Sequence, residues 1–242
     1  MNLPHSIGLQ KTSLIDYPGK VATVLFLPGC NMRCSYCHNS DLALGKTEEL
    51  LNRDDVIDFV KNRAPLLGGV VISGGEPLLH EGISDLIALF HNKLGLSVKL
   101  DTNGMLPERL ESLIDSENKP DFIAMDLKSI PSNYTSFSFC SDAESIIKRS
   151  MKLINESKIP SQYRTTVHSD YINIDMLDEL SELLQGCQDY VLNPFMPGNC
   201  LNPDYNNHPG TTVKELLSLQ EGFISRGINC RVPSVQNCCN PL

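Results

Sequence analysis

The sequence predicts an α/β fold, a partial (β/α)6 barrel of TIM type built from parallel strands. Short apolar runs alternate six times with amphipathic stretches in which apolar residues recur at helical spacing. Strands that alternate with helices pair in parallel through right-handed crossovers, so these strands should share one sheet. No G-x-G-x-x-G pattern follows the first run, which weakens an open dinucleotide-binding sheet as the alternative. The chain has 242 residues, whereas eight units need about 250, so an incomplete barrel fits best.

Each unit begins with a β-type apolar run and continues into a stretch of helical periodicity. Pro107 suits the first turn of its helix, and Gly186 and Gly227 suit the ends of theirs. The six pairs of strand and helix are 21–29 with 47–63, 69–75 with 83–93, 96–104 with 107–115, 121–129 with 144–157, 160–168 with 174–186, and 189–195 with 212–227.

Composition excludes several classes of protein. Hydrophobic residues make up 41% of the chain, enough to supply the core of a single domain over 1–242. We place this core at about 15–228 and a cysteine-containing tail at 229–242. The longest apolar run is far shorter than the roughly 20 residues of a membrane-spanning helix. A net charge of −9 without a basic stripe argues against nucleic acid as a partner. The first residues lack a basic-then-apolar signal segment, so we expect a cytoplasmic protein.

Polar motifs follow every one of the six apolar runs. In chain order they are CNMRCSYCHN, SGGEP, DTNG, MDLK, RTTVH and NPF. The carboxyl ends of the strands converge on one face of such a barrel, and catalytic groups sit there. The six motifs therefore predict a single large site.

Three of the nine cysteines, Cys30, Cys34 and Cys37, fall within eight residues with the spacing C-x3-C-x2-C. Cysteines of cytosolic proteins are more often metal ligands or catalytic groups than disulfide partners, and thiolates suit zinc or iron–sulfur clusters. A structural zinc ion would need a fourth ligand, for which His38 is a candidate. Three cysteines on a four-iron cluster would instead leave one iron open to bind a small molecule. We favour that interpretation over zinc and over a disulfide with one spare thiol.

The segment CNMRCSYC, with an aromatic residue before its third cysteine, resembles the signature of the radical S-adenosylmethionine (radical SAM) enzymes. SGGEP resembles the GGE motif of the same superfamily, in its expected place. GLQKTSLIDYPGKVATVLFLPGCNMRCSYCHN, together with DTNG and DLK, resembles the glycyl-radical-enzyme activases, and the similarity extends from about residue 8 to 198. Within that group the chain is most similar to activating proteins of anaerobic ribonucleoside-triphosphate reductases, because LIDYPGK differs from the DGPG-type segment of pyruvate formate-lyase activases.

This resemblance implies a radical SAM domain in which Cys30, Cys34 and Cys37 hold a 4Fe-4S cluster that cleaves S-adenosylmethionine reductively. The resulting 5′-deoxyadenosyl radical would remove hydrogen from a glycine of a partner glycyl radical enzyme, with anaerobic ribonucleotide reductase as the expected partner. A flavodoxin or ferredoxin is the expected electron donor. The alternatives are a radical SAM enzyme acting on a different glycyl radical enzyme, a peptide or a small molecule, and a non-catalytic iron–sulfur or zinc protein.

The resemblance also implies which residues bind the cofactor. Glu76 is expected to accept hydrogen bonds from the ammonium group of S-adenosylmethionine, while Gly74 and Gly75 let the backbone come close. Arg164 and Lys128 are expected to neutralise the carboxylate of the cofactor.

Further cofactor contacts follow from the same motifs. Asp101 and Asp126 are expected either to hold a monovalent cation or to orient the basic residues. Their plainer alternatives are a cap on the following turn and one half of a structural ion pair. Thr102 belongs with this group, and Tyr36 and His38 are expected to lie along the adenine.

Several residues fall outside the resemblance. Met196 stands where pyruvate formate-lyase activases tend to carry a histidine, which puts that adenosyl contact in doubt. A second metal or cluster site is conceivable for a set of four cysteines, although ordinary thiols are the expectation. We expect four histidines to be surface or packed residues and not ligands. The cysteines are Cys200, Cys230, Cys238 and Cys239, and the histidines are His80, His91, His168 and His208.

Overall fold

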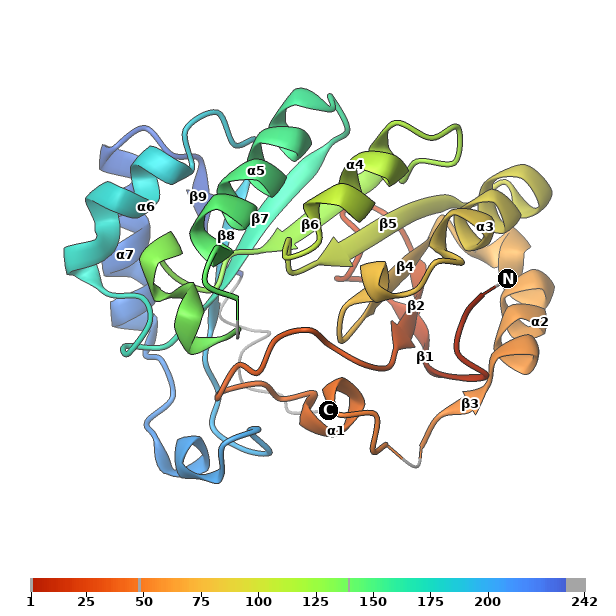
Figure 1. The fold of residues 1–242 in the computed structure, drawn as a ribbon, viewed down its shortest axis with the longest axis horizontal. Coiled ribbons are helices and arrows are strands. Elements are labelled where there is room, and N and C mark those ends of the chain that lie inside the picture. The colour runs from red at the N-terminus through yellow and green to blue at the C-terminus, as the bar shows by residue number, and fades with distance from the viewer. Residues whose placement is uncertain (1, 48, 139, 234–242) are drawn as a thin grey trace.

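The structure is a computed structural model that describes residues 2–47, 49–138 and 140–233. Its centre is one nine-stranded sheet, and the helices cover the outside of that sheet (Figure 1). The strands are β1 (Ser6–Ser13), β2 (Ala22–Leu27), β3 (Leu51–Asn52), β4 (Gly69–Gly74), β5 (Ser97–Thr102), β6 (Phe122–Asp126), β7 (Ser161–Val167), β8 (Tyr190–Pro194) and β9 (Cys230–Arg231).

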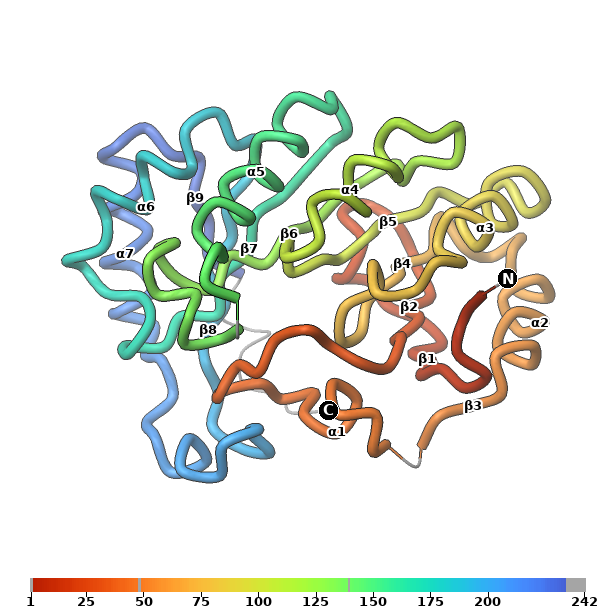
Figure 2. Tube along the Cα trace, in the orientation of Figure 1, coloured from red at the N-terminus to blue at the C-terminus, as the bar shows by residue number. Residues whose placement is uncertain are grey.

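The strands follow the order β3-β1-β2-β4-β5-β6-β7-β8-β9 across the sheet. Six neighbouring strands, β2 and β4 to β8, run parallel and correspond to the six predicted strands. The predicted fold class, a partial barrel of parallel strands, is therefore confirmed. The two edge strands, β3 and β9, do not pair with each other, so the described sheet is open, and Figure 2 follows the chain through it.

The helices follow the predicted positions closely. Pro107 opens its helix as expected, and Gly186 and Gly227 lie just beyond helix ends in the left-handed conformation. Among the described residues, no helix is both long and apolar enough to cross a membrane. The helices are α1 (Ser40–Ala43), α2 (Arg53–Arg63), α3 (Ile83–Ala88), α4 (Pro107–Ile114), α5 (Ala143–Glu156), α6 (Leu177–Leu183) and α7 (Val213–Ser225).

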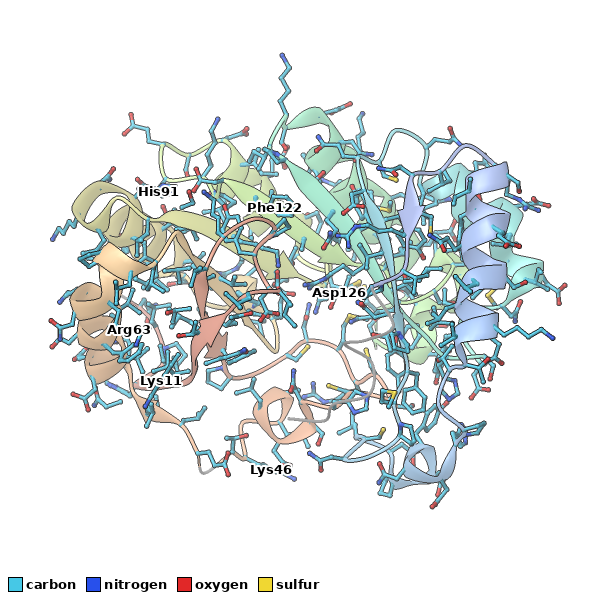
Figure 3. All side chains as sticks on the ribbon, turned by 180° about the vertical axis from the view of Figure 1, so that it is seen from behind. Lys11, Lys46, Arg63, His91, Phe122 and Asp126 are labelled. Atoms are coloured by element: carbon cyan, nitrogen blue, oxygen red, sulfur yellow. The ribbon has the colours of Figure 1, made fainter. Side chains whose placement is uncertain are left out.

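Alternation along the strands separates an apolar core from a polar interior. On β5, Val98 and Leu100 pack into the large core beneath the helices, whereas Lys99 and Asp101 point to the opposite face. The base of this inner face is closed by a second, smaller apolar cluster that includes Tyr17 and, at its margin, Phe122. Figure 3 labels Phe122 together with Asp126, the first and last residues of β6. The polar groups of the inner face thus gather toward the carboxyl ends of the strands.

Three strands were not predicted. β1 pairs antiparallel with β2, and the short strands β3 and β9 pair with β1 and β8 at the two edges. The helix expected over 47–63 begins only at Arg53, because Leu51 and Asn52 pair with β1 and the Asn52 side chain caps the helix.

The sheet therefore reaches from Ser6 to Arg231, beyond the expected core of 15–228 at both ends. Only the first part of the expected tail, up to residue 233, belongs to the described residues.

Candidate functional site

The carboxyl ends of the parallel strands surround a cavity that is covered by residues 28–39, which we call the cysteine loop. The cavity has an empty volume of about 850 Å³, part of it open to solvent, which lies in the usual range of ligand sites. The structure brings twelve of the thirteen predicted site residues to this cavity; Glu76 is the exception. The twelve are Cys30, Cys34, Tyr36, Cys37, His38, Gly74, Gly75, Asp101, Thr102, Asp126, Lys128 and Arg164.

The three thiols of the cysteine loop are free and line the same cavity. Cys34 is buried, and Cys30 and Cys37 are half-buried. Burial raises the pKa of all three thiols, that of Cys34 to about 12, so a metal that binds them as thiolates must displace protons. Asn103 donates to the Cys30 sulfur at 3.7 Å.

Gly74 and Gly75 allow the end of β4 to pack closely against neighbouring backbone. A Cβ atom on Gly75 would lie 2.0 Å from the carbonyl oxygen of Gly29, and one on Gly74 would lie 2.3 Å from that of Leu27. The amide of Gly75 donates to Leu27 O at 2.9 Å, which ties the end of β4 to the base of the cysteine loop. Both glycines also line the cavity, and their close approach to the cofactor stays a prediction.

Glu76 does not reach the cavity, in contrast to the prediction. Its side chain is fully buried, and its carboxylate accepts hydrogen bonds from Leu78 N at 3.0 Å, Thr102 Oγ1 at 3.0 Å and Asn103 N at 2.7 Å. Because these donors from the chain itself occupy both oxygens, Glu76 holds the turn after β5 in place. Burial raises its pKa to about 7, although the three donors oppose the shift.

The change Glu76→Gln is expected to lower the free energy of unfolding by about 1–3 kcal/mol. One carboxylate oxygen would be replaced by an NH2 group, which would face the N–H of Leu78 or Asn103 donor to donor, so that a hydrogen bond would be lost. Urea unfolding measures the loss, with the exposed Glu117→Gln as the matched control. Equal stability of Glu76→Gln and the unmodified chain would contradict this role.

A continuous chain of charged side chains crosses the floor of the cavity. Lys128 Nζ donates to Asp126 Oδ2 at 3.0 Å, and Arg164 reaches the other oxygen of Asp126 from Nε at 2.9 Å. Arg164 also donates to Asp101 Oδ2 at 3.2 Å, and the ammonium of Lys99 contacts Asp101 Oδ1. Three cations thus face two carboxylates, which leaves one net positive charge in the site.

This charge balance sets the ionisation of the two carboxyl groups. Burial is the largest single influence and would raise the pKa of Asp101 and Asp126, but the combined effect of Arg164, a lysine at each position and their hydrogen bonds outweighs it. Both pKa values are therefore lowered, and both groups are carboxylates at neutral pH. The net positive charge suits an anionic group of a ligand.

Sequence reasoning missed other residues in the cavity wall and directly behind it. Lys99 could have been found, because Lys99 and Asp101 stand two apart in an otherwise apolar strand and so share its inner face. Ser73 and Thr166 lie on inward-facing positions of β4 and β7, and Asn103 directly follows β5. All three belong to motifs already placed at the site, SGGEP, RTTVH and DTNG, although no role was assigned to them.

Tyr36 provides a test of whether the cavity suits a ligand. Its ring is packed against Tyr171, Phe137 and Phe195, and its buried hydroxyl has no hydrogen-bond partner within the described ranges. An unpaired buried hydroxyl costs about 1–3 kcal/mol, but this one has almost no accessible surface and so offers a ligand no contact. The fit of the cavity to a cluster and an organic cofactor therefore rests on the three free thiols and on the cations Lys128 and Arg164.

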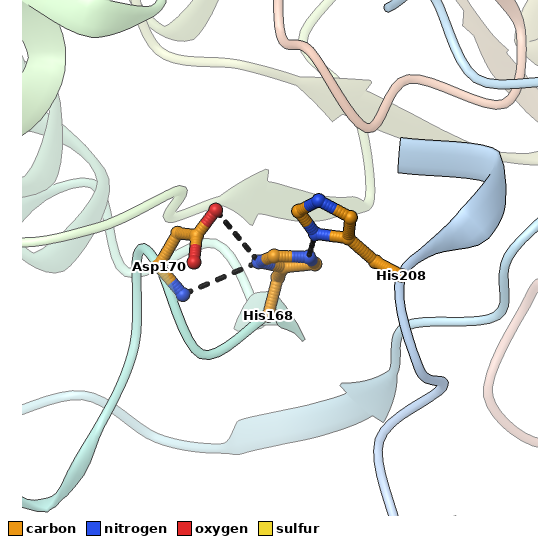
Figure 4. A group of neighbouring side chains, drawn as sticks. All are labelled: His168, Asp170 and His208. Atoms are coloured by element: carbon orange, nitrogen blue, oxygen red, sulfur yellow. Dashed lines mark hydrogen bonds and ion pairs between the residues drawn. The ribbon is translucent and has the colours of Figure 1, made fainter. Parts of the chain in front are cut away.

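A second polar group lies beside the aromatic residues at the end of β7 (Figure 4). His168 is buried; its Nδ1 accepts from the amide of Asp170 at 3.2 Å, and its Nε2 lies 3.0 Å from His208 Nδ1. Both ring nitrogens are thus engaged, on opposite sides of the ring. We interpret this group as a hydrogen-bonded chain and not as a metal centre.

The hydrogen bond between His168 and His208 links the end of β7 to the segment between β8 and α7. This segment in turn contacts the cysteine loop. The amide of Leu201 donates to Cys37 O at 3.1 Å, that of Asn202 donates to Ser35 O at 2.9 Å, and His38 Nδ1 lies 2.9 Å from Gly198 O. His38 is therefore held from outside the cavity, at its rim.

The remaining cysteines do not form one group. Cys200 is buried near the cysteine loop, at the carboxyl end of β8, whereas Cys230 pairs with Tyr190 at the other end of that strand. The two therefore cannot share a metal. Cys238 and Cys239 lie outside the described residues.

Comparison with known proteins identifies the family. The model of the radical SAM superfamily matches residues 24–185. A Methanocaldococcus jannaschii protein named as a glycyl-radical enzyme activating enzyme is 34% identical over 221 residues, 88% of each chain. The chain belongs to the radical SAM superfamily, in its glycyl-radical-enzyme activase group. A pyruvate formate-lyase-activating enzyme of Clostridium pasteurianum is 36% identical to this radical SAM enzyme over 133 residues, 52% of each chain.

Several solved structures share the fold at low sequence identity. SuiB of Streptococcus suis bound to its precursor peptide SuiA aligns with a TM-score of 0.63 and 16% identity over 85% of this radical SAM enzyme. The chain spans about half the length of SuiB, 47%. An archaeal TYW1 aligns with a TM-score of 0.56 and 18% identity, over 85% of this chain and 72% of its own. These likenesses support the partial barrel alone.

Proposed function

We propose that this radical SAM enzyme forms a glycyl radical on an anaerobic ribonucleoside-triphosphate reductase, using a 4Fe-4S cluster held by Cys30, Cys34 and Cys37. The observation that carries the proposal is that three free thiols and a net-positive chain of charges open into one cavity. A four-iron cluster on three cysteines keeps one iron open, next to groups that suit the amino acid end of S-adenosylmethionine.

The charged chain would hold that end of the cofactor. Lys128 and Arg164 face the cavity and would pair with its carboxylate. Asp101 and Asp126 line the cavity as well, and both oxygens of each already accept from side chains of this chain. Both carboxylates contact basic residues. Of their two expected roles, this arrangement favours orienting the basic residues over holding a monovalent cation.

The aromatic side of the cavity would hold the adenosine. Tyr36 and His38 line the cavity, and His38 is held at the rim by Gly198. Thr102 lies between the two sides, where its hydroxyl already donates to Glu76. These residues orient the cofactor and keep water out, which is the contribution that a protein makes to cofactor chemistry.

When bound, the cluster supplies one electron that breaks the C5′–S bond of S-adenosylmethionine, releasing methionine and a 5′-deoxyadenosyl radical that takes hydrogen from the partner's glycine. The residues of this chain neither gain nor lose a proton in that step. Their part is to fix the distance and angle between cofactor and glycine, which governs such transfers.

Two features favour a reductase as the partner. The segment LIDYPGK, residues 14–20, departs from the segment of pyruvate formate-lyase activases, and Met196 stands half-exposed where a histidine would be expected there. The named relatives are activases of pyruvate formate-lyase or activases whose partner is not stated, so they favour a glycyl radical enzyme in general. A flavodoxin or ferredoxin as electron donor and a cytoplasmic location complete the proposal.

Electron paramagnetic resonance tests the choice of partner. The reconstituted protein, S-adenosylmethionine and a reductant are incubated anaerobically with an anaerobic ribonucleotide reductase or with pyruvate formate-lyase. We expect a glycine-centred radical signal with the reductase and none with the lyase. A signal with the lyase alone would show that pyruvate formate-lyase, and not the reductase, is the partner. Release of methionine without a radical signal on either enzyme would favour a peptide or small-molecule substrate.

A further inference from the structure

Lys99 is a buried cation that the proposed cofactor contacts do not use. It lies in the middle of β5 on the inner face, with 1% of its side chain exposed. A buried ammonium group is costly unless it is paired, and here the partner is Asp101 Oδ1. Burial lowers the pKa of Lys99, and the carboxylate of Asp101 is the strongest influence that opposes this shift. The lysine is therefore paired with a carboxylate of the site.

Lys99 is the partner of the remaining carboxylate oxygen of Asp101. The Oδ2 atom of Asp101 accepts from Ser73 Oγ at 3.0 Å and from Arg164 at 3.2 Å, so Oδ1 is left for the ammonium of Lys99. Arg164 continues to Asp126, whose second oxygen is taken by Lys128. Each carboxylate of the site therefore already has a cation on either side.

A free monovalent cation would add to a site that already holds a surplus of positive charge. Lys99, Arg164 and Lys128 face Asp101 and Asp126, so an added ion would set four positive charges against two negative ones. The desolvation of that ion would not be offset by a vacant carboxylate oxygen.

We propose that Lys99 is the built-in counter-ion of Asp101, and that it lets this site bind S-adenosylmethionine without a free monovalent cation. The inference rests on the proposed function, because it concerns the same cofactor. Lys99 is a positioning residue: it acts through Asp101 and Arg164 and does not line the cavity itself.

The first test uses the unmodified, reconstituted protein. Binding of S-adenosylmethionine is measured by anaerobic equilibrium dialysis in potassium, sodium and tetramethylammonium chloride at equal ionic strength. We expect dissociation constants that agree within about twofold, because tetramethylammonium is too large to enter a carboxylate site. Binding that weakens about tenfold in tetramethylammonium would overturn the inference while leaving the proposed function intact. Absence of binding in all three salts would contradict the proposed function itself.

The second test removes the charge. Lys99→Met is expected to weaken binding about tenfold in tetramethylammonium, and potassium or sodium is expected to restore most of the loss. A purely structural role would give a loss that no cation repairs, and that result would overturn the inference. Lys61→Met is the matched control, since Lys61 forms an exposed pair with Asp58 at 2.8 Å. If Lys99→Met fails to fold, the salt series on the unmodified protein decides alone.

Discussion

Replacing Cys34 by alanine is expected to abolish cleavage of S-adenosylmethionine. Cys34 is buried within the cysteine loop, and without it two thiols would remain for a four-iron cluster. Changes to groups around a metal typically cost 10–100-fold, so loss of a ligand should cost at least about 100-fold. Methionine release per iron bound, measured after anaerobic reconstitution, gives the size of the effect.

Cys187→Ala is the matched control for that change. Cys187 is a half-buried free thiol that does not line the cavity, so its loss should leave iron content and methionine release unchanged. A Cys34→Ala protein that retains a full cluster and normal methionine release would show that the three cysteines are not the ligand set.

Arg164→Met is expected to have the second large effect, because Arg164 joins both carboxylates of the site. Without the guanidinium group, Asp101 and Asp126 would face each other across a partly buried space with only their lysines as partners. Breaking such a pair costs about 3–5 kcal/mol of folding free energy. We also expect binding of S-adenosylmethionine to weaken about 100-fold, measured by equilibrium dialysis.

The stability loss of Arg164→Met should depend on pH with a defined sign. In the unmodified protein Arg164 holds the pKa of Asp101 and Asp126 low, so their stabilising contribution is present above the unfolded-state pKa and is lost in acid. Burial would raise both pKa values in the variant, which would then lose stability as the pH rises. The difference between the two proteins should therefore be larger at pH 8 than at pH 5, by about 1 kcal/mol or more.

Urea unfolding at the two pH values measures this difference, and Arg226→Met provides the comparison. Arg226 pairs with Asp178 at the surface, at 2.7 Å, so its loss should cost less than about 1 kcal/mol at either pH. If Arg164→Met lost little free energy of unfolding relative to the unmodified protein, or if that loss became smaller as the pH rises, the role assigned to this arginine would be contradicted.

The partial barrel was predictable because its central strands are buried on both faces. Strands β2, β4, β6 and β8 are largely apolar, whereas β5 and β7 carry polar residues on their inner face, and long helices such as α4 and α5 show a clear apolar stripe. The same regularity placed six polar motifs at one end of the sheet, which is why most candidate site residues reached one cavity.

The features that sequence missed depend on partners distant in the chain. β1 is a largely polar strand, and its place is fixed by pairing with β2. The orientation of Glu76 is set by Thr102 and Asn103, 26 and 27 residues away. The need for glycine at Gly75 comes from the backbone of Gly29, on a neighbouring segment. Such requirements become visible only when the segments are seen side by side.

The most direct test of the account follows a hydrogen atom. The reductase is prepared with its glycines deuterated at Cα and is incubated anaerobically with the reconstituted protein, a reductant and S-adenosylmethionine. We predict that the 5′-deoxyadenosine formed carries deuterium, in step with the growth of the glycine-centred radical. A radical on the reductase accompanied by 5′-deoxyadenosine without deuterium would contradict direct hydrogen transfer from that glycine.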